Sequence, residues 1–200
     1  AVDMTPYRLH NVVLPPFEAA VQAGVAAIMV GFHDLAGIPC TAHRDLLDGL
    51  LRQTWGFDGL LVSDYTAIME LINHGVAADL EHAALLAFNA GVDIDLISEA
   101  YRKHLPALVR SGRVSMHAID AACRRVLQAK QKLGLFDNPY RGLDDSRHAR
   151  APLSAAHRQL ARKAAAQSSV LLKNDGVLPL ATNTRIALIG PLAANRENLQ

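Results

Sequence analysis

Gly59-Leu-Leu-Val-Ser63 is the stretch that decides the fold, because a short apolar run between a glycine and a polar residue predicts a buried strand. An earlier run, Val25-Ala-Ala-Ile-Met-Val-Gly31, has the same character. A third strand is expected from Val92 to Ile97. The first two runs do not alternate apolar and polar residues, which is typical of strands covered on both faces in a parallel sheet.

A helical pattern that ends at a glycine precedes each predicted strand. The helices are expected to begin near Pro15, at a Thr41 cap and at Asp79, and to end at Gly24, Gly56 and Gly91. These glycines are 32 and 35 residues apart, the length of one strand–helix unit. Eight such units build a (β/α)8 barrel of about 250 residues, so these units would be less than half of one. A doubly wound sheet has similar units and is the alternative.

The rest of the chain predicts helices and a second domain. Helices are expected over 105–109, from a Ser115 cap to Leu133, and over 154–167. Apolar strands are expected at the start of 169–180 and over 185–190. The predicted domains are the C-terminal part of a barrel (1–137), a connector with one helix (138–184) and the first strand of an α/β sandwich domain (185–200). Because the chain starts with Ala1 and stops shortly after this strand, we expect a piece of a longer protein.

Composition excludes several classes of protein. Of the 200 residues 50% are apolar and 20% charged, enough for a core, and the net charge of +1 gives no field for nucleic acid or anionic membranes. No apolar run approaches the roughly 20 residues of a membrane span. Cys40 and Cys123 are expected to be small core residues.

No cofactor and no metal are expected. The chain has neither a G-x-G-x-x-G nor a Walker pattern. His74, Asp79, Glu81 and His82 lack the H-E-x-x-H spacing and are expected to form a solvated helix face.

Function in parallel α/β folds gathers at the carboxyl ends of the strands. There the sequence places Phe32 and His33, then Ser63, Asp64 and Tyr65. Asp64 stands on rigid backbone and suits a nucleophile or base, but a carboxylate there also caps helices or accepts from loop N–H groups. Ser63 lacks the G-x-S-x-G context of a nucleophilic serine. Asp93 and Asp95, on the third strand, are expected to be structural, with bonds to each other's neighbours or to an arginine.

Trp55-Gly-Phe-Asp-Gly-Leu-Leu-Val-Ser-Asp64 resembles the segment that carries the catalytic nucleophile in family 3 glycoside hydrolases, the β-glucosidase family. In that family, a W-G-F-x-G-x-x-x-S-D run ends strand seven of a (β/α)8 barrel. Further landmarks follow in the family's order: Ala90–Asp95, Gly134–Pro139, Ser169–Asn174 with Leu178–Leu180, and Ile186–Pro191. The similarity covers essentially the whole chain.

The resemblance implies a retaining mechanism in which Asp64 forms a covalent glycosyl-enzyme. The acid/base residue is expected outside this chain, in the second domain. Where many members have tyrosine and asparagine after strand six, this chain has Phe32 and His33, which with Tyr65 are the expected substrate-binding residues. The family's Asn-Gly at the next turn is Ala36-Gly37 here.

The implied substrates are terminal β-D-glucosides of oligosaccharides or aryl glycosides. β-Xylosidase and β-N-acetylglucosaminidase activity are alternatives within the family, and a catalytically inactive fragment is an alternative outside it. An aldolase-like lyase is a third class, disfavoured because the predicted strand ends carry no lysine. Location and oligomeric state stay open in the sequence, although the resemblance points to the periplasm or secretion.

Overall fold

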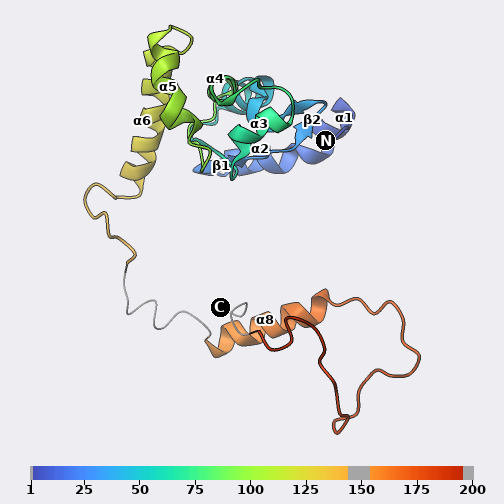
Figure 1. Ribbon diagram of the computed structural model, residues 1–200. Helices are drawn as coiled ribbons and strands as arrows, with labels where there is room; N and C mark the ends of the chain where they lie inside the picture. Colours follow the sequence, from blue (N-terminus) through green and yellow to red (C-terminus); the bar gives the residue numbers. More distant parts are fainter. Residues whose placement is uncertain (1, 144–153, 196–200) are drawn as a thin grey trace. The chain divides into compact units, whose positions relative to one another are not determined.

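The structure is a computed structural model that describes residues 2–143 and 154–195 (Figure 1). It divides into two compact units, Ala1–Gly142 and Leu143–Gln200, and each is described by itself. The ten residues 144–153 of the predicted connector lie outside the described residues. No helix in the described ranges has the length and apolar character needed to cross a membrane.

A small parallel sheet organises the first unit. Strands β1 (Ala27–Val30) and β4 (Leu60–Ser63) pair in parallel with Val30 opposite Ser63. A bridge joins Val62 to Ile94, so the chain around Ile94 runs parallel along the other edge of β4. β4 is therefore central, and the predicted α/β class and parallel pairing are confirmed. Closure of these strands into a (β/α)8 barrel stays a prediction.

The helices before the strands also follow the sequence pattern. They are α2 (Pro15–Gln22), the π-helix η3 (Asp45–Thr54) and α4 (Leu80–Ala90). The three glycines after them have φ of +82°, +72° and +108°, which explains why glycine stands there. The predicted Asp79 cap is confirmed, because its Oδ1 accepts from the His82 N–H at 2.8 Å.

The predicted Thr41 cap is wrong. Thr41 lies in a short 3₁₀ helix, η2 (Cys40–Ala42), and η3 begins after Arg44. The Thr41 hydroxyl instead donates to the Gly31 carbonyl at 3.3 Å, which ties η2 to the loop after β1. A tertiary contact therefore takes the hydroxyl away from the local capping role.

A hairpin after β1 is an addition to the sequence prediction. Strands β2 (Asp34–Leu35) and β3 (Ile38–Pro39) pair antiparallel. Between them Ala36 and Gly37 have φ of +51° and +81°. Positive φ at both central residues is the geometry of the tight hairpin turn that Asn-Gly favours. The remaining short helices of this part are α1 (Pro6–Arg8), η1 (Leu9–Val13) and α3 (Ala67–Asn73).

The third predicted strand is shorter than expected, and the helix after it is longer. Within 92–97 only Ile94 takes part in a bridge. Helix α5 (Ala100–Arg110) replaces the expected 105–109, and α6 (Met116–Lys132) begins at the predicted cap, where Ser115 accepts from the Ala118 N–H at 3.2 Å. The pairing is short because β4 ends at Ser63, and beyond that point the Leu96 N–H bonds the Ser63 side chain in place of a backbone carbonyl.

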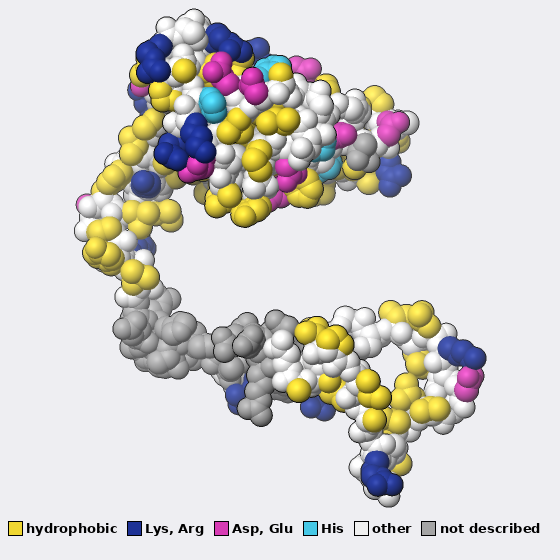
Figure 2. All heavy atoms as spheres, viewed as in Figure 1, with side chains coloured by type: hydrophobic (Ala, Val, Ile, Leu, Met, Phe, Trp, Pro, Cys, Tyr) yellow, Lys and Arg dark blue, Asp and Glu magenta, His cyan; other side chains and the backbone are white. Residues whose placement is uncertain are grey.

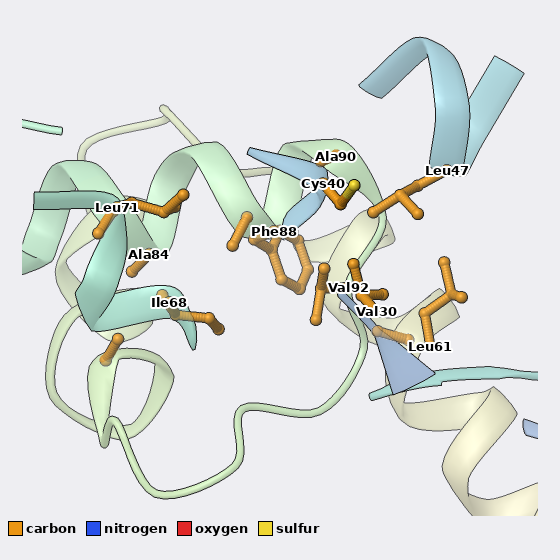
Figure 3. Close-up of a cluster of buried hydrophobic side chains, with 14 of the residues drawn as sticks. Val30, Cys40, Leu47, Leu61, Ile68, Leu71, Ala84, Phe88, Ala90 and Val92 are labelled. Atoms are coloured by element: carbon orange, nitrogen blue, oxygen red, sulfur yellow. The ribbon is translucent and has the colours of Figure 1, made fainter. Parts of the chain in front are cut away.

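The core of the first unit lies between the sheet and the helices. Figure 3 shows Phe88 of α4 among side chains from β1, β4 and α3. The Phe88 ring meets Tyr101 edge to face, with 5.6 Å between the ring centres. Cys40 is buried as predicted, but Cys123 is exposed and its predicted core role is wrong. Ala122, on the neighbouring position of α6, is buried in the core, and Ala118 and Ile119 pack against the core from the same helix.

The second unit contains one regular element among its described residues, α8 (Ala155–Ser168), which confirms the helix predicted over 154–167. Ser154 caps it by accepting from the His157 N–H at 3.2 Å. The strands expected within 169–180 and over 185–190 do not form. Figure 2 shows hydrophobic side chains exposed along the chain that follows α8. Apolar sequence alone does not make a strand, because its N–H and C=O groups need a neighbouring strand and its side chains a face to cover. The exposed large residues are Val170, Leu171, Leu172, Val177, Leu178, Leu180, Ile186, Leu188, Ile189 and Leu192.

Candidate active site

The carboxyl ends of β1 and β4 lie at the same edge of the sheet, because the two strands are parallel and Val30 pairs with Ser63. Phe32 and Asp64 come just after these two ends. The Phe32 residue is 51% exposed and Tyr65 is 64% exposed, so both rings offer apolar surface beside the half-buried Asp64. Exposed aromatic rings beside a carboxylate suit a polar ligand that has apolar faces.

One oxygen of the Asp64 carboxylate is held by the backbone. The Tyr65 N–H donates to Asp64 Oδ1 at 2.6 Å, and the Ala67 N–H donates to the Asp64 carbonyl at 3.2 Å. In the part of the chain that the structure describes, Oδ2 has no protein hydrogen-bond partner. The N-cap residue of α3 is Thr66, so Asp64 accepts from a loop N–H without capping the helix. One anchored and one open oxygen leave the carboxylate able to react.

His33 lies next to a thiol. Its Nε2 is 3.6 Å from Cys40 Sγ, and both residues line an apolar hollow of about 190 Å³ beneath α2 and η3. Burial raises the pKa of the Cys40 thiol, and the nearby Asp34 carboxylate adds to the rise. Asp34 itself pairs with His74 at 2.7 Å between Oδ1 and Nδ1, which ties the loop after β1 to the end of α3.

The Asp64 carboxylate does not line either of two hollows of the first unit. Phe32, Asp64 and Tyr65 line neither the hollow beside His33 nor a second one, of about 450 Å³, around Asp95 and Arg102. The structure thus brings Phe32, Asp64 and Tyr65 to one open edge of the sheet without enclosing them.

A buried charge cluster lies beside the other end of β4, and sequence reasoning found only one of its members. Asp93 accepts from Arg52 Nη2 at 2.7 Å, from Arg125 Nη2 at 2.7 Å and from the Leu61 N–H at 2.9 Å. The expectation that Asp93 is structural and bonds an arginine is confirmed. Asp95 is also structural in part, since its Oδ2 accepts from the Tyr101 N–H at 3.1 Å. One sequence signal could have identified Arg52 as a member of this cluster: its charge stands next to the leucine stripe of its helix.

The four residues weighed as metal ligands have separate partners. His74 pairs with Asp34, Asp79 caps α4, and Glu81 pairs with Arg113 at 2.8 Å. His82 Nδ1 accepts from the Ala78 N–H at 3.2 Å. Within residues 2–143 and 154–195, no three His, Cys, Asp or Glu side chains converge as metal ligands.

The chain matches the Glycosyl hydrolase family 3 N terminal domain over residues 1–129. Because this match covers more than half of the chain, the protein belongs to glycosyl hydrolase family 3, and the resemblance stated from the sequence is confirmed.

Individual relatives match over nearly the full length of the chain. It is 44% identical to a periplasmic β-glucosidase of Salmonella typhimurium, over 99% of this chain and 26% of that protein. It is 40% identical to a putative β-xylosidase of Formosa agariphila, over 96% of this chain and 26% of that protein. A crystal structure of a β-glucosidase from Listeria innocua matches with a TM-score of 0.79 and 38% identity, over 89% of this chain and 25% of that one. The chain thus spans about a quarter of the length of these relatives.

Proposed function

We propose that this chain carries the nucleophile of a retaining β-glycosidase and that Asp64 is that nucleophile. One observation carries the proposal: Asp64 directly follows the central strand β4, with one oxygen held by the Tyr65 N–H at 2.6 Å and the other open. A nucleophile needs a fixed direction and a free lone pair, and this arrangement supplies both.

In the first step an oxygen of the Asp64 carboxylate attacks C1 of the sugar and forms an ester. The bond from C1 to the leaving oxygen breaks, and a second carboxylic acid donates its proton to that oxygen. In the second step the same residue takes a proton from water while the water oxygen attacks C1. The ester bond then breaks, and Asp64 returns to a carboxylate, so the sugar keeps its β configuration.

The acid/base residue of this mechanism is proposed to lie outside the chain. The two carboxyl groups of a retaining site are about 5–5.5 Å apart. Two acidic residues of the described part have partners of their own: Asp34 pairs with His74, and Glu70 accepts from the Thr66 hydroxyl at 2.9 Å. The chain spans only about a quarter of the length of its relatives, so another part of the protein can supply this residue.

Phe32, His33 and Tyr65 are proposed to contact the sugar. Phe32 and Tyr65 each expose an aromatic ring, which can pack against the C–H face of a pyranose. His33 supplies a ring nitrogen for a hydroxyl group. These contacts set the position of C1 relative to Asp64.

We infer a terminal β-D-glucoside as the substrate, because the periplasmic β-glucosidase matches at 44% identity. A β-xyloside is the second candidate, since a putative β-xylosidase matches at 40%. The two sugars differ by one CH₂OH group. Residues of the sugar pocket that lie outside this chain would distinguish them. The name of the first relative also favours a periplasmic location.

The test is covalent labelling of the full-length protein with 2-deoxy-2-fluoro-β-D-glucosyl fluoride, followed by peptide mass spectrometry. The fluorine at C2 slows both steps, whereas the good fluoride leaving group at C1 keeps the first step fast, so the ester accumulates. Label on the peptide that contains Asp64 is the expected result, and Asp64→Asn should take up none. Label on any other carboxylate overturns the assignment. The matched xylosyl reagent, used in parallel, decides between the two substrates.

A further inference from the structure

Ser63 and Thr66, which stand on either side of Asp64 and Tyr65, are both hydrogen-bonded to one residue, Leu96. The Leu96 N–H donates to Ser63 Oγ at 2.8 Å, and the Thr66 N–H donates to the Leu96 carbonyl at 3.2 Å. Only two residues, Asp64 and Tyr65, lie between these two bonded positions. A shift at either bond therefore changes the direction of the Asp64 carboxylate.

The Ser63 hydroxyl replaces a backbone acceptor just beyond the point where the hydrogen-bond ladder of β4 ends. The pairing of β4 with the next segment stops at the Val62–Ile94 bridge and the bond from Ser63 N–H to the Ile94 carbonyl at 2.9 Å. Beyond that point the Leu96 N–H has no backbone acceptor among the described residues, and Ser63 Oγ accepts in its place. Ser63 is 0% exposed, so water does not reach this position. An alanine here would leave a buried N–H unpaired.

The loop that holds Leu96 is strained. Ile97 and Glu99 have φ of +73° and +56°, and Thr66 in the facing loop has φ of +58°. Positive φ is a true outlier for a β-branched residue such as Ile97. Such strain persists only where surrounding bonds fix the backbone. A second buried serine, Ser98, joins the loop of Leu96 to α3 by accepting from the Met69 N–H at 3.3 Å, so its bond does not flank Asp64 and Tyr65.

We propose that Ser63 is a positioning residue for Asp64, and this inference rests on the proposed function. Its hydroxyl fixes the loop at Leu96 and so fixes the direction from which the carboxylate attacks C1. A misplacement of about 1 Å lowers the rate of such a step by about 100-fold. Because Ser63 is buried and does not reach the sugar, its loss should slow the chemical step while sugar binding changes little.

The experiment measures the inactivation of the full-length protein by the fluorinated glucosyl reagent, with separate values for the rate constant and the binding constant. Ser63→Ala removes the acceptor, and Ser63→Cys keeps nearly the same volume with a weak acceptor. Ser98→Ala is the matched control, because it removes another buried hydroxyl of the same loop, one that bonds α3 and does not flank Asp64. Circular dichroism and the melting temperature establish that each variant is folded.

We expect both Ser63 variants to lose about 30- to 100-fold in the rate constant and to stay within about threefold in binding. Ser98→Ala should stay within about threefold in both. A Ser63→Cys rate near the wild-type value, or an equal loss of rate in Ser98→Ala, overturns the inference about Ser63. If the label is still found on Asp64 in that case, the proposed function stands. Label away from Asp64 overturns both. In the unaltered protein, rapid hydrogen exchange at the Leu96 amide would also overturn the inference, independently of any variant.

Discussion

Asp93 and Arg52 form a buried ion pair, with 2.7 Å between Asp93 Oδ2 and Arg52 Nη2 and only 1% of the Asp93 side chain exposed. The same carboxylate accepts from Arg125 of α6 and from the Leu61 N–H of β4. Arg52 also donates to the Gly59 carbonyl at 3.1 Å. Burial lowers the pKa of the Arg52 guanidinium, and Asp93 acts in the opposite direction. The cluster joins a helix on each side to the amino-terminal half of β4, whose other end carries Asp64.

Replacing Asp93 by asparagine should destabilise the protein strongly, because the part-buried Arg52 and Arg125 would lose the counter-charge of the buried carboxylate. Breaking a buried pair from one side typically costs about 3–5 kcal/mol. Urea denaturation of the full-length protein, followed by far-ultraviolet circular dichroism, measures the loss. Glu81→Gln is the control, because it breaks the solvent-exposed pair with Arg113, worth about 0.2–1 kcal/mol. Equal losses in the two variants would contradict the buried role of Asp93.

The Asp64→Gly variant should lose turnover of an aryl β-glucoside by several orders of magnitude while it stays folded. The half-buried side chain contributes little packing, and its loss opens space next to C1. Sodium azide should restore part of the activity and yield an α-glycosyl azide, since the small anion attacks from the vacated side. Product configuration by NMR checks this. A β-glycosyl azide, or no rescue with the bound sugar intact, would argue that Asp64 has another role.

Tyr65→Ala should lower kcat/KM by about 3- to 10-fold, the loss of one aromatic contact of about 0.5–1.5 kcal/mol. At 64% exposure the ring adds little to the core, so the melting temperature should hardly change. Steady-state kinetics and a thermal scan measure the two effects. Tyr140→Ala, an exposed tyrosine beyond α6, should leave both unchanged. A Tyr65 variant with unaltered kinetics would remove this ring from the sugar site.

The two cysteines should differ in reactivity toward a thiol reagent. Burial raises the pKa of Cys40, so little thiolate is present at pH 8, whereas Cys123 is exposed. Mass spectrometry after brief iodoacetamide treatment should find Cys123 alkylated and Cys40 intact. Since a free thiol in an unfolded chain ionises near pH 8.5, the stabilisation from Cys40 is complete below that pH and is lost as the pH rises toward the folded-state value. Prompt alkylation of Cys40 in the folded protein would contradict this.

The 200 residues expressed alone should show no turnover of an aryl β-glucoside. The proposed acid/base residue is missing, and the outer edge of β1 lacks a hydrogen-bonded neighbour among the described residues. An exposed strand edge favours association. Activity assays and size-exclusion chromatography measure both effects. Measurable turnover by a monomeric chain would overturn the proposal that the second carboxylic acid lies elsewhere.

Local signals predicted the elements that depend on near neighbours in the chain. The caps at Asp79 and Ser115 and the glycine after each helix form as expected, because each involves groups within about four residues. The pairing of β1 with β4 followed from strand–helix spacing. The family followed from the order of its motifs, which needs no structure at all.

Local signals gave wrong predictions where long-range contacts determine the structure. Thr41 looks like a cap, but its hydroxyl bonds Gly31, and Cys123 looks like a core residue of α6 but lies on an exposed position of the helix. The strands expected within 169–180 and over 185–190 lacked partners, so their apolar residues stayed exposed. In each case the outcome depends on groups far away in the sequence.

The sequence by itself determined the α/β class, the family and the position of Asp64 after a strand, because hydrophobic periodicity, glycine spacing and motif order are local properties of the chain. Only the tertiary structure decided that Leu96 bonds both Ser63 and Thr66. It also decided that two arginines share Asp93. Such bonds join residues about 30 to 40 positions apart or more, and they form only once the parallel strands have brought their ends to the same edge of the sheet.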